Sequence, residues 1–336
     1  MNLLVGTVGR QSAMRVVGSY VALMKPRIIE LLLITTVPAM IVAKQGIPSI
    51  WLVLMTLAGG TLSAGGANAV NMWADRDIDS LMKRTQKRPL VTGEISPTSA
   101  LVFAVILEVL AFFELALLVN LLSALFAIAA ALFYIFVYTL WLKRTSTQNI
   151  VIGGAAGAAP VLVGWAAVAN SVSWTPVVMF MIIFLWTPPH FWALAFRYKD
   201  DYTRANIPML PAVATPKKTA QEIVIYTVML WIATLVLVPV AHLGIIYTVA
   251  ALVLGGGFFA YVIRLYRDCS PKAAMKVFSY SISYLTLLFL AMGIDILGRS
   301  GSPGVILVNT QKLDLARFTL RKRSKLRKFS LTRDAP

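Results

Sequence analysis

Nine stretches of mostly apolar residues divide the chain, and each is close to the roughly 20 residues that a helix needs to cross the hydrocarbon core of a bilayer. They cover residues 29–45, 50–73, 99–118, 122–141, 150–168, 175–196, 222–241, 244–263 and 277–297. Gly, Ala and Ser are frequent inside them, and such small residues let helices approach closely in lipid. The pattern predicts an all-α, polytopic membrane protein with nine transmembrane helices in one intramembrane domain, residues 29–297.

The composition narrows the class of protein further. Of the 336 residues, 58% are apolar and 13% are charged, whereas a soluble domain is about one quarter charged. These values exclude a soluble enzyme, a disordered chain and a secreted disulfide scaffold. The single cysteine, Cys269, excludes an intrachain disulfide and a CxxC metal or redox site.

The distribution of Lys and Arg predicts the orientation in the membrane, because these residues are enriched in cytoplasmic loops. If the N-terminal segment 1–28 is cytoplasmic, the inner segments hold twenty Lys and Arg and the outer loops hold only Lys44. The basic tail, residues 298–336, carries ten and opposes the rule, since nine helices place it outside. We interpret it as a flexible tail that is solvated or bound to lipid headgroups, and not as a nucleic-acid site.

Two inner loops, about 74–98 and 197–221, are long, and long loops in a compact fold tend to carry function. The first follows Asn71, Asp75 and Asp79, whose spacing of four residues puts all three on one helix face. Asp77 lies about 200° around the helix from Asp75 and points elsewhere.

Carboxylates close to the bilayer are costly, and a hard divalent cation such as Mg²⁺ is the simplest compensation for them. The alternative is a solvated helix end with salt bridges to Arg76 or Lys83. Basic residues follow at once, and acids, Mg²⁺ and Lys or Arg together suit a diphosphate. That basic run reads Lys83-Arg84-Thr85-Gln86-Lys87-Arg88.

The second long loop repeats the pattern of acids at an inner helix end. It opens with Asp200 and Asp201, and Arg197, Asp201 and Arg204 lie about one turn apart. The segment is either a second metal–diphosphate half-site or an exposed ion-pair loop. Because each acidic region follows an even-numbered helix, we expect two related halves that face one another.

These residues resemble those of the intramembrane polyprenyl transferase superfamily, whose mark is N-x3-D-x3-D after the second helix. The chain is most similar to its haem-modifying branch, and the matching segments extend over residues ~20–297. They are Lys25-Pro26-Arg27, Asn71 to Asp79, Met82-Lys83-Arg84-Thr85, Arg88-Pro89-Leu90, Tyr138-Thr139, Leu142-Lys143-Arg144, Asn149 to Gly157, Trp186 to Ala195, and Asp200 to Pro211. Ala205 departs from the D-x3-D of many members, so Asp201 has no acidic partner four residues later.

The resemblance implies a central cavity open to the cytoplasmic face and a position in the bacterial inner membrane. It also implies a reaction in which a farnesyl group passes from farnesyl diphosphate to a vinyl group of protohaem IX, with Mg²⁺ as cofactor, for the assembly of haem–copper oxidases. Haem A synthase and oxidase assembly factors are then candidate partners. The assigned residues are Asn71, Asp75, Asp79, Asp200 and Asp201 for catalysis; Asp75, Asp79 and Asp201 for the metal; Arg27, Lys83, Arg84, Lys143 and Arg204 for the diphosphate; and His190 for haem.

Other intramembrane polar and aromatic residues have both functional and purely structural interpretations. His190 follows Pro188-Pro189, and an intramembrane His is a functional hypothesis by default. It binds haem iron or a propionate, moves a proton, or is a buried hydrogen-bonded side chain. Aromatic faces stabilise cations, but helix packing explains them equally well; the aromatic candidates are Tyr134, Tyr138, Phe191 and Trp192. Snorkelling or internal hydrogen bonds account for the acids within the spans, which are Glu30, Glu108, Glu114 and Asp295.

Two other functions compete with this one. Another prenyltransferase of the superfamily would act on a quinone or chlorophyll precursor. A secondary transporter for an anionic lipid or phosphorylated solute would hold its substrate near mid-membrane. In this chain the ionisable clusters gather at one face, which favours an enzyme that takes a soluble headgroup from the cytoplasm.

Overall fold

Eight helices are long and apolar enough to cross a membrane within residues 14–300, the part of the chain that this computed structural model describes. They are α3 (Ile50–Ala74), α6 (Pro97–Leu118), the continuous segment Leu121–Thr145, α9 (Asn149–Ala169), α10 (Trp174–Arg197), α13 (Pro216–Val240), α14 (Ile245–Asp268) and α15 (Pro271–Ser300). A further helix, α2 (Pro26–Lys44), has 19 residues. The protein therefore spans the membrane several times, and the count of nine crossings stays a prediction.

The helix ends follow from local capping residues. Ser49, Ser96, Asn120 and Thr215 each accept a hydrogen bond from a main-chain N–H in the first turn of the helix that follows. Thr215 caps α13, which starts at Pro216, six residues before the apolar stretch that the sequence predicts, because Lys217 and Lys218 are helical but too polar to count as part of a span.

The segment Leu121–Thr145 contains a change of helix type. It comprises α7 (Leu121–Leu132), the π-helix η1 (Phe133–Leu142) and α8 (Lys143–Thr145). π-helical turns are uncommon and occur frequently at functional sites. The wider turns of η1 carry Tyr134, Tyr138 and Thr139.

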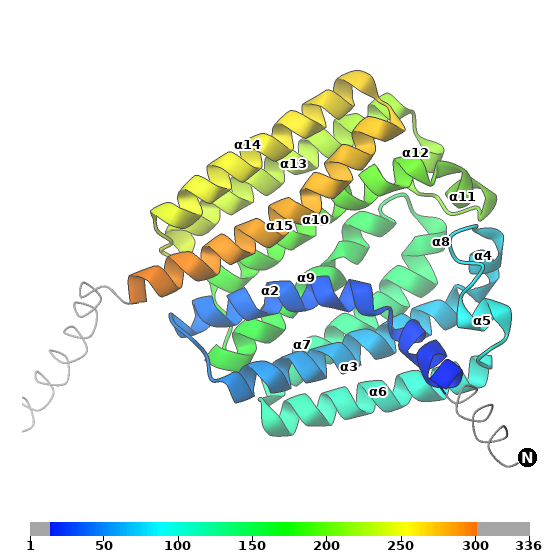
Figure 1. The fold of residues 1–336 in the computed structure, drawn as a ribbon, viewed down its shortest axis with the longest axis horizontal. Helices are drawn as coiled ribbons and strands as arrows, with labels where there is room; N and C mark the ends of the chain where they lie inside the picture. The colour runs from blue at the N-terminus through cyan, green and yellow to red at the C-terminus, as the bar shows by residue number, and fades with distance from the viewer. Residues whose placement is uncertain (1–13, 301–336) are drawn as a thin grey trace, which may run out of the picture.

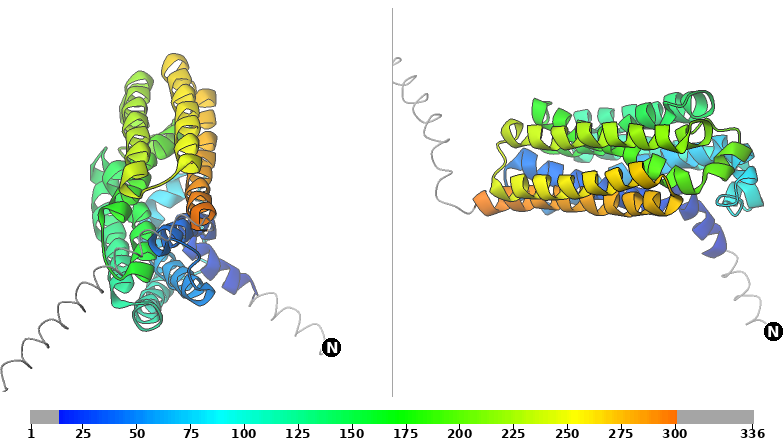
Figure 2. Two further views of the ribbon diagram at one scale, coloured as in Figure 1. Left: turned by 90° about the vertical axis from the view of Figure 1, so that its left-hand side faces the viewer. Right: turned by 90° about the horizontal axis from the view of Figure 1, so that it is seen from above.

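The long helices lie side by side, and the short ones gather at one end of the bundle (Figures 1 and 2). α3 packs on α6, α10 on α13, and α14 on α15, while α2 contacts α9, α15 and α3. The gathered short helices are α4 (Arg76–Leu81), α5 (Pro89–Thr92), α8, α11 (Lys199–Arg204) and α12 (Leu210–Val213). α15 ends at the opposite end. The two long loops of the sequence therefore meet at one end of the bundle.

Several predicted residues take structural roles or lie outside the described part. Asp295 accepts hydrogen bonds from the main-chain N–H groups of Gly244 (2.6 Å) and Tyr247 (3.4 Å), so it caps α14. Glu108 of α6 accepts a hydrogen bond from Ser63 (3.1 Å). The side chains of Arg27 and Glu30, and the tail beyond residue 300, lie outside the described residues.

Close helix contacts depend on glycine, and Gly164 gives a testable case. A Cβ there would lie 2.7 Å from the main-chain oxygen of Thr36 on α2, and a main-chain atom cannot turn aside. We expect Gly164→Ala to destabilise the protein by about 1–3 kcal/mol through overpacking. Gly157→Ala, on the same helix with nothing within 4 Å of its Cβ, is the matched control. Thermal unfolding in detergent measures both; equal midpoints would contradict the packing argument.

Candidate active site

A cavity of about 320 Å³ lies between the helices and reaches the end where the short helices gather. Its walls come from α2, α3, α7, η1, α9 and α10. Its charged and amide lining is Lys25, Asn68, Asn71, Asp79, Arg84, Arg88, Lys143 and Asn149, whereas small residues such as Gly60, Ala64, Ala67, Ala127, Ala131 and Gly157 line the rest. One end of the cavity is therefore ionic, and the remainder suits an apolar chain.

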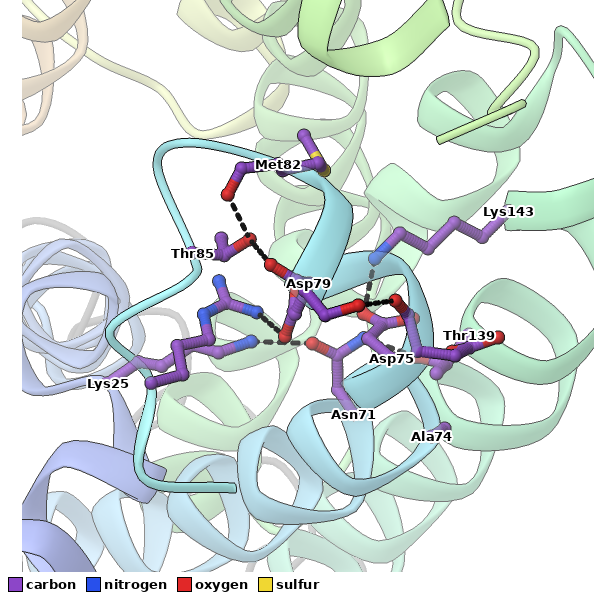
Figure 3. A network of polar contacts seen from close by, with 12 residues as sticks. Lys25, Asn71, Ala74, Asp75, Asp79, Met82, Thr85, Thr139 and Lys143 are labelled. Atoms are coloured by element: carbon purple, nitrogen blue, oxygen red, sulfur yellow. Dashed lines mark hydrogen bonds and ion pairs between the residues drawn. The ribbon is translucent and has the colours of Figure 1, made fainter. Parts of the chain in front are cut away.

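Asn71, near the end of α3, is held from both sides (Figure 3). Its amide oxygen accepts a hydrogen bond from the Lys25 Nζ (2.5 Å), and its amide nitrogen donates to the Thr139 Oγ1 of η1 (3.0 Å). Burial, reinforced by the nearby charges of Arg88 and Lys143, lowers the pKa of Lys25 to about 7. An anion bound beside Lys25 would favour its protonated form.

Asp75 and Asp79 are both buried and paired with cations. The Asp75 Oδ2 accepts from the Lys143 Nζ, while its Oδ1 is buried without a partner. The Asp79 Oδ2 accepts from Arg88 (2.5 Å). These partners, Lys143 and Arg88, are not the Arg76 or Lys83 that the sequence suggests as alternatives.

The face argument from the sequence is confirmed by burial. Asn71, Asp75 and Asp79 are each at most 2% exposed. Asp77 is exposed and forms two 2.7 Å hydrogen bonds with Arg144. That pairing lowers the pKa of Asp77 to about 2, so it stays ionised and bound at neutral pH.

The second acidic region packs against the first. Ile78 and Met82 belong to one apolar cluster with Tyr202 and Ile207, and Arg84 lies over the Tyr198 ring at 5.7 Å. The two acidic regions are thus in contact, while the expected relatedness of two halves stays a prediction.

The acids of the second region differ from each other. Asp201 is buried and pairs with Arg204, whereas Asp200 is exposed. Neither lines the cavity, and the same holds for Arg204 and Lys83. Their roles at the metal or the diphosphate stay predictions.

His190 is a residue of α10 that contacts α15, and it is absent from the cavity lining. Its Nδ1 is 2.7 Å from the Ser281 Oγ, and its ring stacks on Trp186 at 4.2 Å. Haem binding by His190 therefore stays a prediction. Of the aromatic candidates, Tyr134, Tyr138 and Phe191 line the cavity and Trp192 does not.

Sequence reasoning missed three residues of the ionic end: Lys25, Arg88 and Asn149. Asn149 starts α9, is 1% exposed and lines the cavity, and both polar atoms of its amide lack a partner. A buried amide without partners signals a group that binds there. The sequence signal that could have identified Asn149 as a site residue is a single amide directly before an apolar stretch. For Lys25 the signal is its place in Lys25-Pro26-Arg27, and for Arg88 it is its place in the basic run.

The site combines two buried acids, Asp75 and Asp79, with four cations, Lys25, Arg84, Arg88 and Lys143, at the end of an apolar intramembrane cavity. This combination defines a class of enzyme whose substrate has an anionic headgroup and an apolar tail. The chain belongs to the UbiA prenyltransferase family, whose sequence profile matches residues 32–292.

Two relatives carry the name protoheme IX farnesyltransferase. The one from Clavibacter sepedonicus is 55% identical over 281 residues, which is 82% of this chain and 92% of the relative. The one from Saccharopolyspora erythraea, numbered 1, is 54% identical over 283 residues, 83% of this chain and 90% of the relative.

Solved structures share the fold. A digeranylgeranylglyceryl phosphate synthase superposes with a TM-score of 0.71 at 18% identity, over 84% of this chain and 99% of that one. A UbiA homolog from Archaeoglobus fulgidus bound to DMAPP and Mg²⁺ gives 0.60 at 17% identity, over 83% and 99%.

Proposed function

We propose that this protein transfers a farnesyl group from farnesyl diphosphate to a vinyl group of protohaem IX and yields haem O and diphosphate. The observation that carries the proposal is the buried group of Asn71, Asp75 and Asp79. Asn71 and Asp79 line the ionic end of an apolar cavity, and Asp75 lies behind Lys143, which also lines it. The chain is also 55% identical to a protein of that name. The concentration of charge at one end favours an enzyme over a transporter.

The cations of the cavity bind the diphosphate in this proposal. Lys25, Arg84, Arg88 and Lys143 all line the ionic end, and Arg88 and Lys143 neutralise Asp79 and Asp75 in the absence of substrate. A diphosphate offers these side chains more acceptor oxygens than a carboxylate does. They would stabilise the charge that develops on the leaving group.

The residues present fit a magnesium ion. Mg²⁺ takes one or two carboxylates together with phosphate oxygens and waters, and the Asp75 Oδ1 is a buried carboxylate oxygen without a partner. Asp75 and Asp79 would hold the metal, with Asp201 at a second position. When bound, Mg²⁺ supplies positive charge that stabilises the departing diphosphate.

The rest of the cavity would hold the farnesyl chain and exclude water. The C–O bond of the substrate breaks and leaves its electron pair on the diphosphate; the vinyl π electrons then form the new C–C bond. Water adds to the resulting cation, and its proton leaves to solvent. Tyr134 and Tyr138, stacked at 5.3 Å in the cavity wall, are placed to stabilise the allylic cation through their ring faces.

The test is direct synthesis. Purified protein is incubated with Mg²⁺, protohaem and farnesyl diphosphate, and the haem is analysed by chromatography and mass spectrometry. Haem O supports the proposal. A prenylated quinone precursor in a parallel reaction, with no haem O, would replace it with another activity of the same family.

We also propose that the protein resides in the bacterial cell membrane with both long loops in the cytoplasm. This orientation can be tested by cysteine labelling. In a Cys269→Ser background, single cysteines replace the exposed residues Ser80, Thr203 and Ser171. Ser171 lies between α9 and α10, at the end opposite α4 and α11. A membrane-impermeant thiol reagent on intact cells should label only the cysteine at 171; labelling at 80 and 203 alone would invert the orientation. The side on which the tail lies is outside the described residues.

A further inference from the structure

Two neighbouring glycines of α3 lie in different surroundings. A Cβ on Gly59 would lie 2.5 Å from the Leu115 Cγ, so this glycine serves the contact between α3 and α6. A Cβ on Gly60 would meet nothing within 4 Å, and Gly60 lines the cavity. Gly157 of α9 also lines the cavity with nothing within 4 Å. The missing side chains at Gly60 and Gly157 therefore leave part of the cavity open.

The position of Gly60 along α3 gives its depth. α3 ends at the ionic site, and Gly60 precedes Asn71 by eleven residues. At 1.5 Å per residue, Gly60 lies about 16 Å below the amide of Asn71. Thr56, which is 1% exposed and also lines the cavity, lies one turn deeper.

This depth corresponds to the length of one isoprenoid. An extended carbon chain advances about 1.2 Å per bond, so the eleven bonds of a farnesyl main chain reach about 13 Å and the seven of a geranyl chain reach about 8 Å. The P–O and O–C bonds of the ester add about 3 Å to each length. With its diphosphate at Asn71, a farnesyl chain therefore ends about 16 Å away, beside Gly60. A geranyl chain ends about one turn earlier, near Ala64.

We propose that Gly60 sets the isoprenoid length, because its missing side chain leaves the space that the third isoprene unit occupies. This inference rests on the proposed function, since it concerns the prenyl substrate of the same site. The Gly60→Leu variant would fill that space and leave the first two units unobstructed.

The experiment compares farnesyl and geranyl diphosphate as donors to protohaem. For Gly60→Leu we expect kcat/KM with farnesyl diphosphate to fall by about 100-fold, within the range that one or two misfitting carbons produce. The kcat/KM with geranyl diphosphate should stay within about 3-fold of the wild-type value, a change as small as that of a typical surface substitution. Ala58→Leu is the matched control, because Ala58 is exposed on the same helix and gains a side chain of similar size; its farnesyl-to-geranyl ratio should equal that of wild type.

An unchanged ratio in folded Gly60→Leu, or an equal fall with both donors, would overturn the inference. If Gly60→Leu does not fold, Gly60→Ala should shift the ratio in the same direction by about 10-fold, and no shift there would overturn it as well. If the wild-type protein makes no prenylated haem, the proposed function fails on its own. Thermal stabilisation by the thiolodiphosphate analogues of farnesol and geraniol then tests Gly60 without turnover, with loss of the farnesyl effect alone as the expected result.

Discussion

Asp75→Ala is expected to lower haem O formation by at least about 1,000-fold, the upper range for removal of one group that stabilises transition-state charge. Asp75 is fully buried and does not itself line the cavity, but it pairs with Lys143, which does. Asp77→Ala, two residues away, should cost less than about 5-fold, because an exposed ion pair contributes about 1 kcal/mol or less. Haem O is measured by mass spectrometry at equal amounts of inserted protein.

The control separates chemistry from a buried unpaired charge. Asp75→Ala leaves Lys143 without its partner, which by itself destabilises a buried site. The double variant Asp75→Ala, Lys143→Ala removes that charge and should recover thermal stability while it stays inactive. Equal losses from Asp75→Ala and Asp77→Ala would refute the assignment.

Removal of divalent metal is expected to abolish turnover completely. Within the described residues, no three His, Cys, Asp or Glu side chains lie close enough to hold a metal ion together. In the proposed function, phosphate oxygens of the substrate and waters complete the coordination of Mg²⁺. We therefore expect Mg²⁺ to restore activity after EDTA treatment, with Ca²⁺ restoring less of it.

The same reasoning predicts how the metal requirement depends on substrate. The Mg²⁺ concentration at half-maximal activity should fall as farnesyl diphosphate is raised, because each supplies ligands or charge to the other. Initial rates on a grid of the two concentrations measure this. Full activity in excess EDTA would remove the metal role from Asp75, Asp79 and Asp201 alike.

Periodicity in the sequence identified the membrane helices and the common burial of Asn71, Asp75 and Asp79, because both depend on local helical geometry. It did not detect the break at Asp75, which separates α3, with Asn71, from α4, with Asp79. The same local reasoning placed Asp77 on another face, and its exposure agrees. Helix starts were less accurate: polar first turns such as that of α13 are helical through capping, which hydropathy does not detect.

The partners of the acids could not be predicted in this way. Lys143 lies 68 residues after Asp75, and only the packing of η1 beside α3 brings the two together. The amide of Asn71 meets Thr139 for the same reason. His190 illustrates the opposite case, since its neighbours Trp186 and Phe191 line the cavity while its own ring turns towards Ser281.

The sequence by itself determined the membrane-spanning class, the ends at which charge gathers and the faces of individual helices, since each depends on residues within a few turns of one another. Only the tertiary structure decided which cation neutralises which carboxylate, and which glycine, Gly59 or Gly60, borders open space. Those properties depend on which helices become neighbours. Side chains on helices far apart in the sequence then share one low-dielectric cavity, where a missing partner or a missing side chain has its largest effect.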